Sequence, residues 1–173
     1  MNKNFLFLVL VLFFIMILPL SADGPEFAGY FGNYNIIKTP LNYYSSGIII
    51  QPGVEFHFHD NDMKLALLGE LGGGWGAPFA LEYNLGGVLE FYYLFFGIGG
   101  GFGLAGDLFE WVGSDRTTTN TPYTRFSLLF RSEDDEIKFC FNGQLYHGTK
   151  WDFANIDNWG FGIALCLNIK SLF

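Results

Sequence analysis

The last fifteen residues of the chain alternate between large apolar and small or polar side chains, and this pattern constrains the fold more than any other feature. One parity holds Trp159, Phe161, Ile163, Leu165, Leu167, Ile169 and Phe173, interrupted only by Ser171. The other parity holds Gly160, Gly162, Ala164, Cys166, Asn168 and Lys170. A period of two predicts a β-strand, because successive strand side chains point to opposite faces. The small, mildly polar face is typical of a barrel interior, so we expect the apolar face to contact lipid.

The same alternation recurs upstream and predicts a series of antiparallel strands. Six further strands are expected over residues 48–58, 64–75, 79–91, 96–104, 125–131 and 137–145. An eighth strand is required, because an open sheet edge in lipid would leave backbone groups without hydrogen-bond partners. Residues 27–37 are the remaining candidate, and their poor alternation predicts a β-bulge or an early end. We therefore expect an all-β fold, an eight-stranded antiparallel up-and-down transmembrane β-barrel.

The composition agrees with a membrane protein and excludes other classes. Half of the 173 residues are hydrophobic and only 15% are charged, which rules out a disordered chain and fits a soluble helical domain poorly. The formal net charge is −8, and the nine Lys and Arg residues form no basic run. We therefore expect no nucleic-acid partner.

The N-terminus has the layout of a secretory signal peptide. Lys3 precedes an uninterrupted apolar run from Phe5 to Leu20, which is followed by the small residues Ser21 and Ala22. We expect cleavage after Ala22, with residues 1–22 as the signal peptide and 23–173 as the outer-membrane barrel domain. The alternative is an uncleaved membrane anchor, because the run approaches the roughly 20 apolar residues that a spanning helix needs.

The connections and the aromatic residues predict how the barrel is oriented. The short connections at 59–62, 93–95 and 132–135 fall on the side of both termini, whereas the longer ones at 108–120 and 148–158 fall on the other. This matches short periplasmic turns and long extracellular loops. Aromatic residues are expected to form two girdles at the membrane interfaces. The outer girdle comprises Trp75, Phe79, Tyr146 and Trp159, and the inner one Phe58, Tyr92, Tyr93, Phe95, Phe130 and Phe173.

With these features the chain resembles the small eight-stranded outer-membrane proteins of the OmpX type and the transmembrane domain of OmpA. The most specific element is the ending from Gly162 to Phe173, which looks like the C-terminal signal read by the barrel assembly machinery. The resemblance implies that this machinery is a partner, and that the signal residues are Leu165, Leu167, Ile169 and Phe173. Ser171 departs from the family, which usually has an apolar or aromatic residue there. The family includes structural proteins, adhesins, small-solute conduits and lipid-modifying enzymes, so the fold does not decide the function.

Charged residues on the inward parity predict a polar lumen. They are Glu55, Lys64, Glu70, Glu82, Glu90, Arg125, Arg131 and Lys138. Opposite charges buried there must pair, and we expect Glu70 or Glu82 to pair with Arg125. The favoured interpretation is a plug that stabilises the barrel, because an eight-stranded interior is just wide enough to be filled by side chains. The alternative is a gate that opens when the pairs exchange partners.

The residues that could carry other chemistry give weak signals. His57 and His59 share a face, but without a third ligand we expect them to line the barrel mouth and not to bind a metal. His147 is expected on the lipid-facing side, away from the inward Ser127, so no catalytic residues are assigned and lipid modification remains a minority alternative. The glycine pattern from Gly101 to Gly106 has no helix after it, so we expect no nucleotide cofactor.

The long loops offer aromatic and charged residues that could contact an extracellular ligand. The candidates are Trp111, Arg116, Lys150 and Trp151. Nothing in these loops identifies the ligand, and the same residues could contact lipid headgroups.

The two cysteines raise the possibility of a disulfide. If His147 faces Trp159 across the last hairpin, Cys140 faces Cys166 on the inward side. Opposed residues of an antiparallel pair lie within the distance that a disulfide accepts, and an exported protein meets an oxidising compartment. The alternative is a register shifted by two residues, with the two thiols simply filling the lumen.

Overall fold

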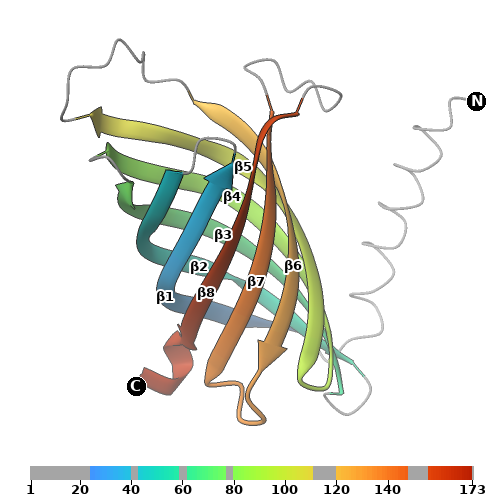
Figure 1. The fold of residues 1–173 in the computed structure, drawn as a ribbon. Helices are drawn as coiled ribbons and strands as arrows, with labels where there is room; N and C mark the ends of the chain where they lie inside the picture. The colour runs from blue at the N-terminus through green and yellow to red at the C-terminus, as the bar shows by residue number, and fades with distance from the viewer. Residues whose placement is uncertain are drawn as a thin grey trace, which may run out of the picture.

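Eight antiparallel strands form a closed barrel in a computed structural model that describes residues 24–39, 43–58, 62–76, 80–110, 120–147 and 156–172. In chain order, as Figure 1 shows, the elements are β1 (Pro25–Thr39), β2 (Tyr43–Phe58), β3 (Met63–Gly76), β4 (Ala80–Tyr93), β5 (Phe96–Glu110), β6 (Thr121–Arg131), β7 (Ile137–His147), β8 (Ile156–Asn168) and the short 3-10 helix η2 (Ile169–Leu172). Each strand pairs with its neighbours in the chain, and β1 pairs with β8 to close the sheet. The predicted signal peptide, residues 1–22, lies outside the described residues.

Strand β1 is longer and more regular than its alternation suggests. Its register runs without a break from Pro25↔Phe56 to Lys38↔Tyr43 on one side and from Tyr30↔Asn168 to Thr39↔Trp159 on the other. The expected bulge or early end is therefore wrong. The alternation is obscured because large residues, Tyr30, Tyr34 and Ile36, point inward and are buried there. The register shifts occur elsewhere, at Leu81/Glu82 between β4 and β5 and at Tyr146/His147 between β7 and β8.

The outer wall of the barrel is apolar and exposed. Every strand contributes outward aliphatic or aromatic side chains, and Trp75, Phe102 and Phe126 are each more than 60% exposed. None of the helices among the described residues is long and apolar enough to cross a membrane.

The aromatic girdles differ in part from the expectation. Trp75 and Trp159 are exposed on the wall, as are Tyr93 and Phe95 near the other end. Tyr92 and Tyr146 instead point into the lumen and are almost fully buried, because they share the parity of the inward side chains of β4 and β7. Phe58 is also buried, whereas Phe79 and Phe173 lie outside the described residues.

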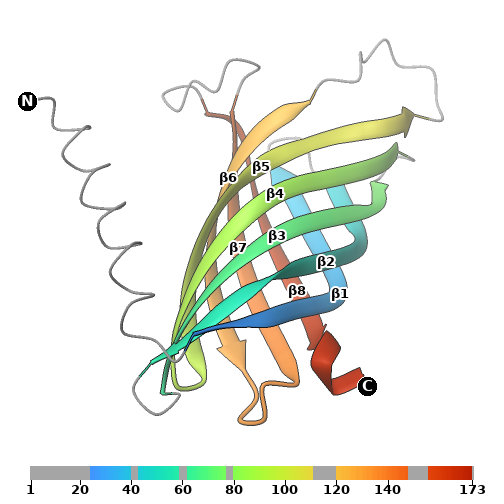
Figure 2. The ribbon, with the colours of Figure 1, turned by 180° about the vertical axis from the view of Figure 1, so that it is seen from behind.

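The two ends of the barrel differ in the way its strands are connected. The strand ends where β2 leads to β3, β4 to β5 and β6 to β7 lie at the end that holds the C-terminal helix η2, and the β5–β6 and β7–β8 strand ends lie at the opposite end (Figure 2). Adjacent short turns are tied together by backbone bonds, Leu94 N–H to Asp62 O at 2.7 Å and Arg131 N–H to Phe95 O at 2.8 Å. This arrangement agrees with the predicted separation of short turns from long loops.

Inward glycines let neighbouring strands approach closely. A Cβ on Gly53 would overlap the carbonyl oxygen of Leu67 and come within 2.8 Å of the Cα of Leu68. On the outer wall the constraint is absent at Gly143, where a Cβ would have nothing within 4 Å. Small inward residues are therefore part of how the strands pack, whereas the outward Gly143 is not required by the barrel.

Candidate functional site

Four carboxylates are buried in the lumen, and each forms an ion pair. Glu55, Glu70, Glu82 and Glu90 are at most 6% exposed, because they occupy inward positions of β2, β3 and β4. Their cationic partners come from β6 and β7 and from β1, which pairs with β8 where the barrel closes. The pairs are Glu55–Arg131, Glu70–Arg125, Glu82–Lys38 and Glu90–Lys138.

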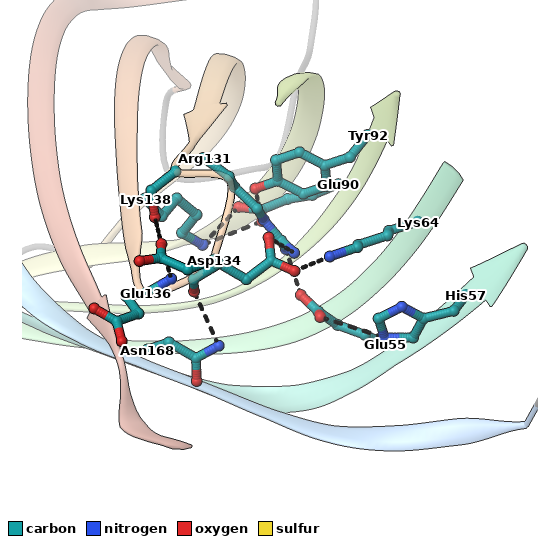
Figure 3. A network of polar contacts seen from close by, with 12 residues as sticks. Glu55, His57, Lys64, Glu90, Tyr92, Arg131, Asp134, Glu136, Lys138 and Asn168 are labelled. Atoms are coloured by element: carbon teal, nitrogen blue, oxygen red, sulfur yellow. Dashed lines mark hydrogen bonds and ion pairs between the residues drawn. The ribbon is translucent and has the colours of Figure 1, made fainter. Parts of the chain in front are cut away.

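The layer nearest the short turns is organised around Arg131 (Figure 3). The Arg131 guanidinium pairs with Glu55, which also accepts a hydrogen bond of 2.7 Å from the Tyr30 hydroxyl. The guanidinium carbon lies 3.7 Å from the ring centroid of Tyr92 and 5.3 Å from that of Tyr30. Arg131 is therefore held by a carboxylate and by two aromatic faces, both of which stabilise a cation removed from water.

The central layer is a continuous chain of hydrogen bonds. Lys138 Nζ lies 3.1 Å from both carboxylate oxygens of Glu90 and donates to Gln51 Oε1 at 2.7 Å. The Gln51 amide donates in turn to Glu70 at 2.8 Å. Arg125 Nη1 lies 2.5 Å from Glu70 Oε2, which is the first of the two pairings expected from the sequence. Gln51 thus links two ion pairs that would otherwise be separate.

Tyr123 completes this layer, since its hydroxyl donates to the other oxygen of Glu70 at 3.1 Å. Glu70 therefore accepts bonds from Gln51, Arg125 and Tyr123. A buried carboxylate with three donors is well compensated for the loss of its hydration.

The layer toward the long connections is built on Glu82. Lys38 Nζ lies 3.0 Å from Glu82 Oε1, and the Ser45 hydroxyl donates to Oε2 at 2.5 Å. The Lys38 ammonium also lies 5.1 Å from the ring centroid of Tyr146, whose hydroxyl donates to Gln144. Glu82 is therefore paired with β1 and not with Arg125, the second pairing considered above.

The turn between β6 and β7 reaches the opposite wall of the barrel. Asp135 in this turn forms an ion pair with Lys64 of β3, and its Oδ1 lies 3.6 Å from Arg131 Nη1. Its backbone has a φ of 58°, in the left-handed region that Asp adopts more easily than most residues. Asn168 of β8 donates to the Asp135 carbonyl at 3.2 Å. Lys64 is therefore at the mouth of the lumen, bound to the turn.

Asp134 in the same turn is exposed and stabilises the turn locally. Its carboxylate accepts a hydrogen bond from the Ser132 hydroxyl and one of 3.2 Å from the backbone N–H of Glu136. These bonds favour the charged form, so the pKa of Asp134 lies below its ordinary value.

The described charges of the lumen are balanced, and side chains fill much of the space between them. Among the side chains that the structure describes, the four buried carboxylates are matched by four cations, and five tyrosines (Tyr30, Tyr34, Tyr92, Tyr123 and Tyr146) occupy space between them. An eight-stranded barrel has room for side chains but not for a wide aqueous channel. Within the part of the chain that the structure describes, each buried carboxylate therefore has a cation, and the side chains can obstruct the lumen.

The cysteines are free, because the register of the last hairpin differs by two residues from the one that would bring them together. Leu145, and not His147, faces Trp159. Cys140 therefore pairs with Ala164, and Cys166 pairs with Lys138. The register is thus the shifted alternative, the two thiols are not directly opposed, and both are buried among the lumen side chains.

The histidines also differ from the expectation in part. His147 is 2% exposed and therefore buried and not open to lipid, although it shares the outward parity of Leu145, which pairs with Thr124. Its Nε2 lies 3.0 Å from the Thr124 hydroxyl, whereas Ser127 donates to Asn142 at 2.7 Å. His57 lies near the mouth, with Nε2 3.9 Å from carboxylate oxygens of both Glu26 and Glu55. Within the described ranges, no three His, Cys, Asp or Glu side chains are placed to hold a metal ion.

Several lumen residues escaped the sequence analysis. Lys38, Gln51 and the five tyrosines were not assigned to the network, although all lie on the inward parity of their strands. Their parity could have identified them. The outer-loop candidates Trp111, Arg116, Lys150 and Trp151 lie outside the described residues, as does Phe173 of the assembly signal. Of the remaining signal residues, Leu165 and Leu167 are outward on β8, whereas Ile169 lies in η2 and not in the strand.

Comparison with known proteins supports the fold and no narrower group. The sequence matches no protein family and no curated protein. A solved structure described as "De novo design of transmembrane beta-barrels" is similar, with a TM-score of 0.50, 13% identity, and coverage of 86% of this chain and 99% of that chain. At this identity the likeness shows the fold alone, a closed antiparallel barrel. The resemblance to the OmpX and OmpA type stays a prediction.

Proposed function

We propose that the chain is an integral outer-membrane β-barrel with a plugged lumen, which acts as a structural or surface-exposed protein through its long loops. The observation that carries the proposal is the inversion of polarity between the two faces of the sheet. Paired charges are buried inside, and large apolar side chains are exposed outside. This is the reverse of a water-soluble barrel and matches one surrounded by lipid.

Strand lengths support the membrane location. A strand tilted by about 45° needs about 9–11 residues to cross the hydrocarbon core. The shortest strands here, β6 and β7, have 11 residues each, and β2 has 16. The similar designed protein is itself described as a transmembrane barrel. The apolar, Lys-led N-terminus favours export through a cleaved signal peptide.

The plug is favoured over a small-solute conduit because of what opening would require. Water could pass only if buried pairs such as Glu90–Lys138 separated, and each carries several kcal/mol of desolvation that its partner offsets. The linkage of Glu90–Lys138 to Glu70–Arg125 through Gln51 means that one pair cannot move without disturbing the next. We therefore assign the lumen a stabilising role and no enzymatic one.

We assign one proposed partner to each of three surfaces: the outer wall of the barrel, its C-terminal strand and its long loops. Membrane lipid covers the apolar wall, and the barrel assembly machinery recognises the β8 ending with Leu165, Leu167, Ile169 and Phe173. An extracellular ligand would bind the long loops that carry Trp111, Arg116, Lys150 and Trp151.

Location is tested by fractionating cells that express the full chain. We expect the protein in the outer membrane, beginning at Asp23 by N-terminal sequencing, and with a gel mobility that changes on heating because the folded barrel resists detergent. Recovery in the soluble fraction would contradict the membrane location, and a protein that begins at Met1 would contradict cleavage.

The plug is tested by conductance in planar bilayers. We expect no sustained current from the wild-type protein, and a current from a variant in which Glu70 and Arg125 are both replaced by Ala. A stable wild-type conductance would favour the conduit instead. Changes in outer-membrane lipids that depend on the protein, detected by mass spectrometry, would favour the lipid-modifying alternative.

A further inference from the structure

A polar patch interrupts the apolar outer wall over β1 and β2. It consists of Asn33, Asn35, Tyr44 and Ser46, which all lie on the outward parity. Asn35 and Ser46 are paired in the β1–β2 register, and the Tyr44 hydroxyl donates to Asn35 Oδ1 at 2.5 Å. The patch is therefore one contiguous surface on two neighbouring strands.

Asn33 lies near the middle of the apolar wall. Thr39 pairs with Trp159, an exposed aromatic near the long-connection end, and Asn33 is six residues along β1 from that level. At a rise of about 3.4 Å per residue and a tilt of about 40°, six residues correspond to about 15 Å along the barrel axis. The apolar band of a membrane barrel is about 25 Å tall, so this depth lies well inside it.

The amide of Asn33 is exposed at this depth without a hydrogen bond from the described residues. Apart from Asn35 of the patch, its neighbours on the wall are apolar: Phe31 on the same strand, and Ile48 and Leu165 across the two strand pairings. An amide that faces hydrocarbon without a hydrogen-bond partner is strongly unfavourable. Two polar side chains elsewhere on the outer wall have partners within the chain, since Thr124 contacts His147 and Tyr83 donates to Asn120.

We infer that the β1–β2 polar patch is the interface through which two copies of this chain associate in the membrane, with Asn33 bonding Asn33 of the second copy. The inference rests on the proposed membrane location. All copies insert in the same direction, so a two-fold axis along the membrane normal brings the same residue of each copy together at the same depth. An amide is both donor and acceptor, and is therefore complementary to itself.

The shape of the wall beside the patch suits such a contact. A shallow hollow of about 690 Å³ extends from Asn35, Ile37 and Tyr44 across β8, β7 and β6, with Gly143 on its floor and Phe126 and Phe161 on its edges. Two convex barrels touch along a narrow line, and a hollow next to that line gives the side chains of the second copy space to pack. Lipid headgroups are an unsuitable partner, because they do not reach the middle of the apolar band.

The test is cross-linking of the refolded full-length mature chain in phospholipid vesicles at high dilution. In a background with Cys140→Ala and Cys166→Ala, Ile48→Cys places a thiol beside the intact Asn33 amide, and Phe102→Cys places one on the opposite wall as the matched control. A short bismaleimide is expected to give several-fold more dimer with Ile48→Cys than with Phe102→Cys. Equal yields, or no dimer from either variant, would overturn the inference.

Adding Asn33→Leu to the Ile48→Cys variant isolates the amide. A polar bond between membrane segments contributes about 0.6–2 kcal/mol, so its loss in Asn33→Leu should raise the dimer Kd by about 3- to 30-fold. Unchanged dimer yield with Asn33→Leu would refute the role of the amide. In native membranes, a cross-linked product whose mass is not twice that of the chain would show that another protein binds the patch. That result would overturn the inferred dimer. Heat-dependent gel mobility of each variant reports folding in the membrane separately, so a failure of the membrane location is distinguishable from a failure of the dimer.

Discussion

Removing Arg125 should destabilise the barrel by leaving a charge without its partner in the lumen. Arg125 and Glu70 have side chains only 3% and 2% exposed, and their charged atoms are 2.5 Å apart. Breaking one half of such a buried pair costs about 3–5 kcal/mol, because the remaining carboxylate cannot be rehydrated. Gln51 and Tyr123 still donate to Glu70 in Arg125→Met, so we expect a loss near the lower end, about 3 kcal/mol.

A double variant separates the stranded charge from lost packing. Met retains much of the volume of Arg, and Glu70→Gln removes the charge while keeping the shape. Arg125→Met with Glu70→Gln should therefore recover most of the stability lost in Arg125→Met alone, since a neutral pair carries no uncompensated charge. Ser127→Ala is the control on the same face of β6, where loss of the 2.7 Å bond to Asn142 should cost about 1 kcal/mol.

The assay is reversible urea unfolding in lipid vesicles, followed by tryptophan fluorescence and by heat-dependent gel mobility. Each variant gives a free energy of unfolding, and the four states of Arg125 and Glu70 complete a double-mutant cycle. The reasoning is refuted if Arg125→Met costs no more than Ser127→Ala, or if the double variant is as unstable as Arg125→Met.

Three further predictions concern strand packing, the β6–β7 turn and the cysteines. Gly53→Ala should prevent folding or lower the free energy of unfolding in urea by several kcal/mol, because its Cβ would overlap Leu67. Gly143→Ala is the control and should be neutral or stabilising by about 0.5–1 kcal/mol. Equal effects of the two variants would contradict the packing argument. The lowered pKa of Asp134 means that its stabilisation of the turn is present above the ordinary value of about 3.9 and is lost as the pH falls through the folded pKa. Ser132→Ala should therefore raise the pKa of Asp134 in an NMR titration, and an unchanged value would exclude the Ser132 bond as its cause. Alkylation of unreduced, unfolded protein should label both Cys140 and Cys166, and protection of the pair until reduction would instead reveal a disulfide.

Much of the barrel could be predicted because the alternation of side chains within each strand indicates which residues point inward and which point outward. The alternation around Glu82, Arg125 and Lys138 placed these residues inside, and they are buried there. It was less informative for β1, where Tyr34 fills the lumen and looks like a lipid-facing residue. An inward aromatic and an outward aromatic have the same hydrophobicity, so only the neighbouring strands distinguish them.

The sequence by itself determined seven of the strands, the side to which most side chains point and the separation of short turns from long connections, because these depend on local periodicity and chain order. The eighth strand followed from the requirement that a membrane barrel has no open edge. Only the tertiary structure decided which side chains meet. A shift of two residues keeps every side chain on its face while changing every partner, and this places Cys166 opposite Lys138 and not opposite Cys140. The partners across the lumen, Lys38 with Glu82 and Arg131 with Glu55, depend on closure of the sheet and on the accumulated register of all eight strands. No single strand carries that information, because register and closure are properties of the whole barrel.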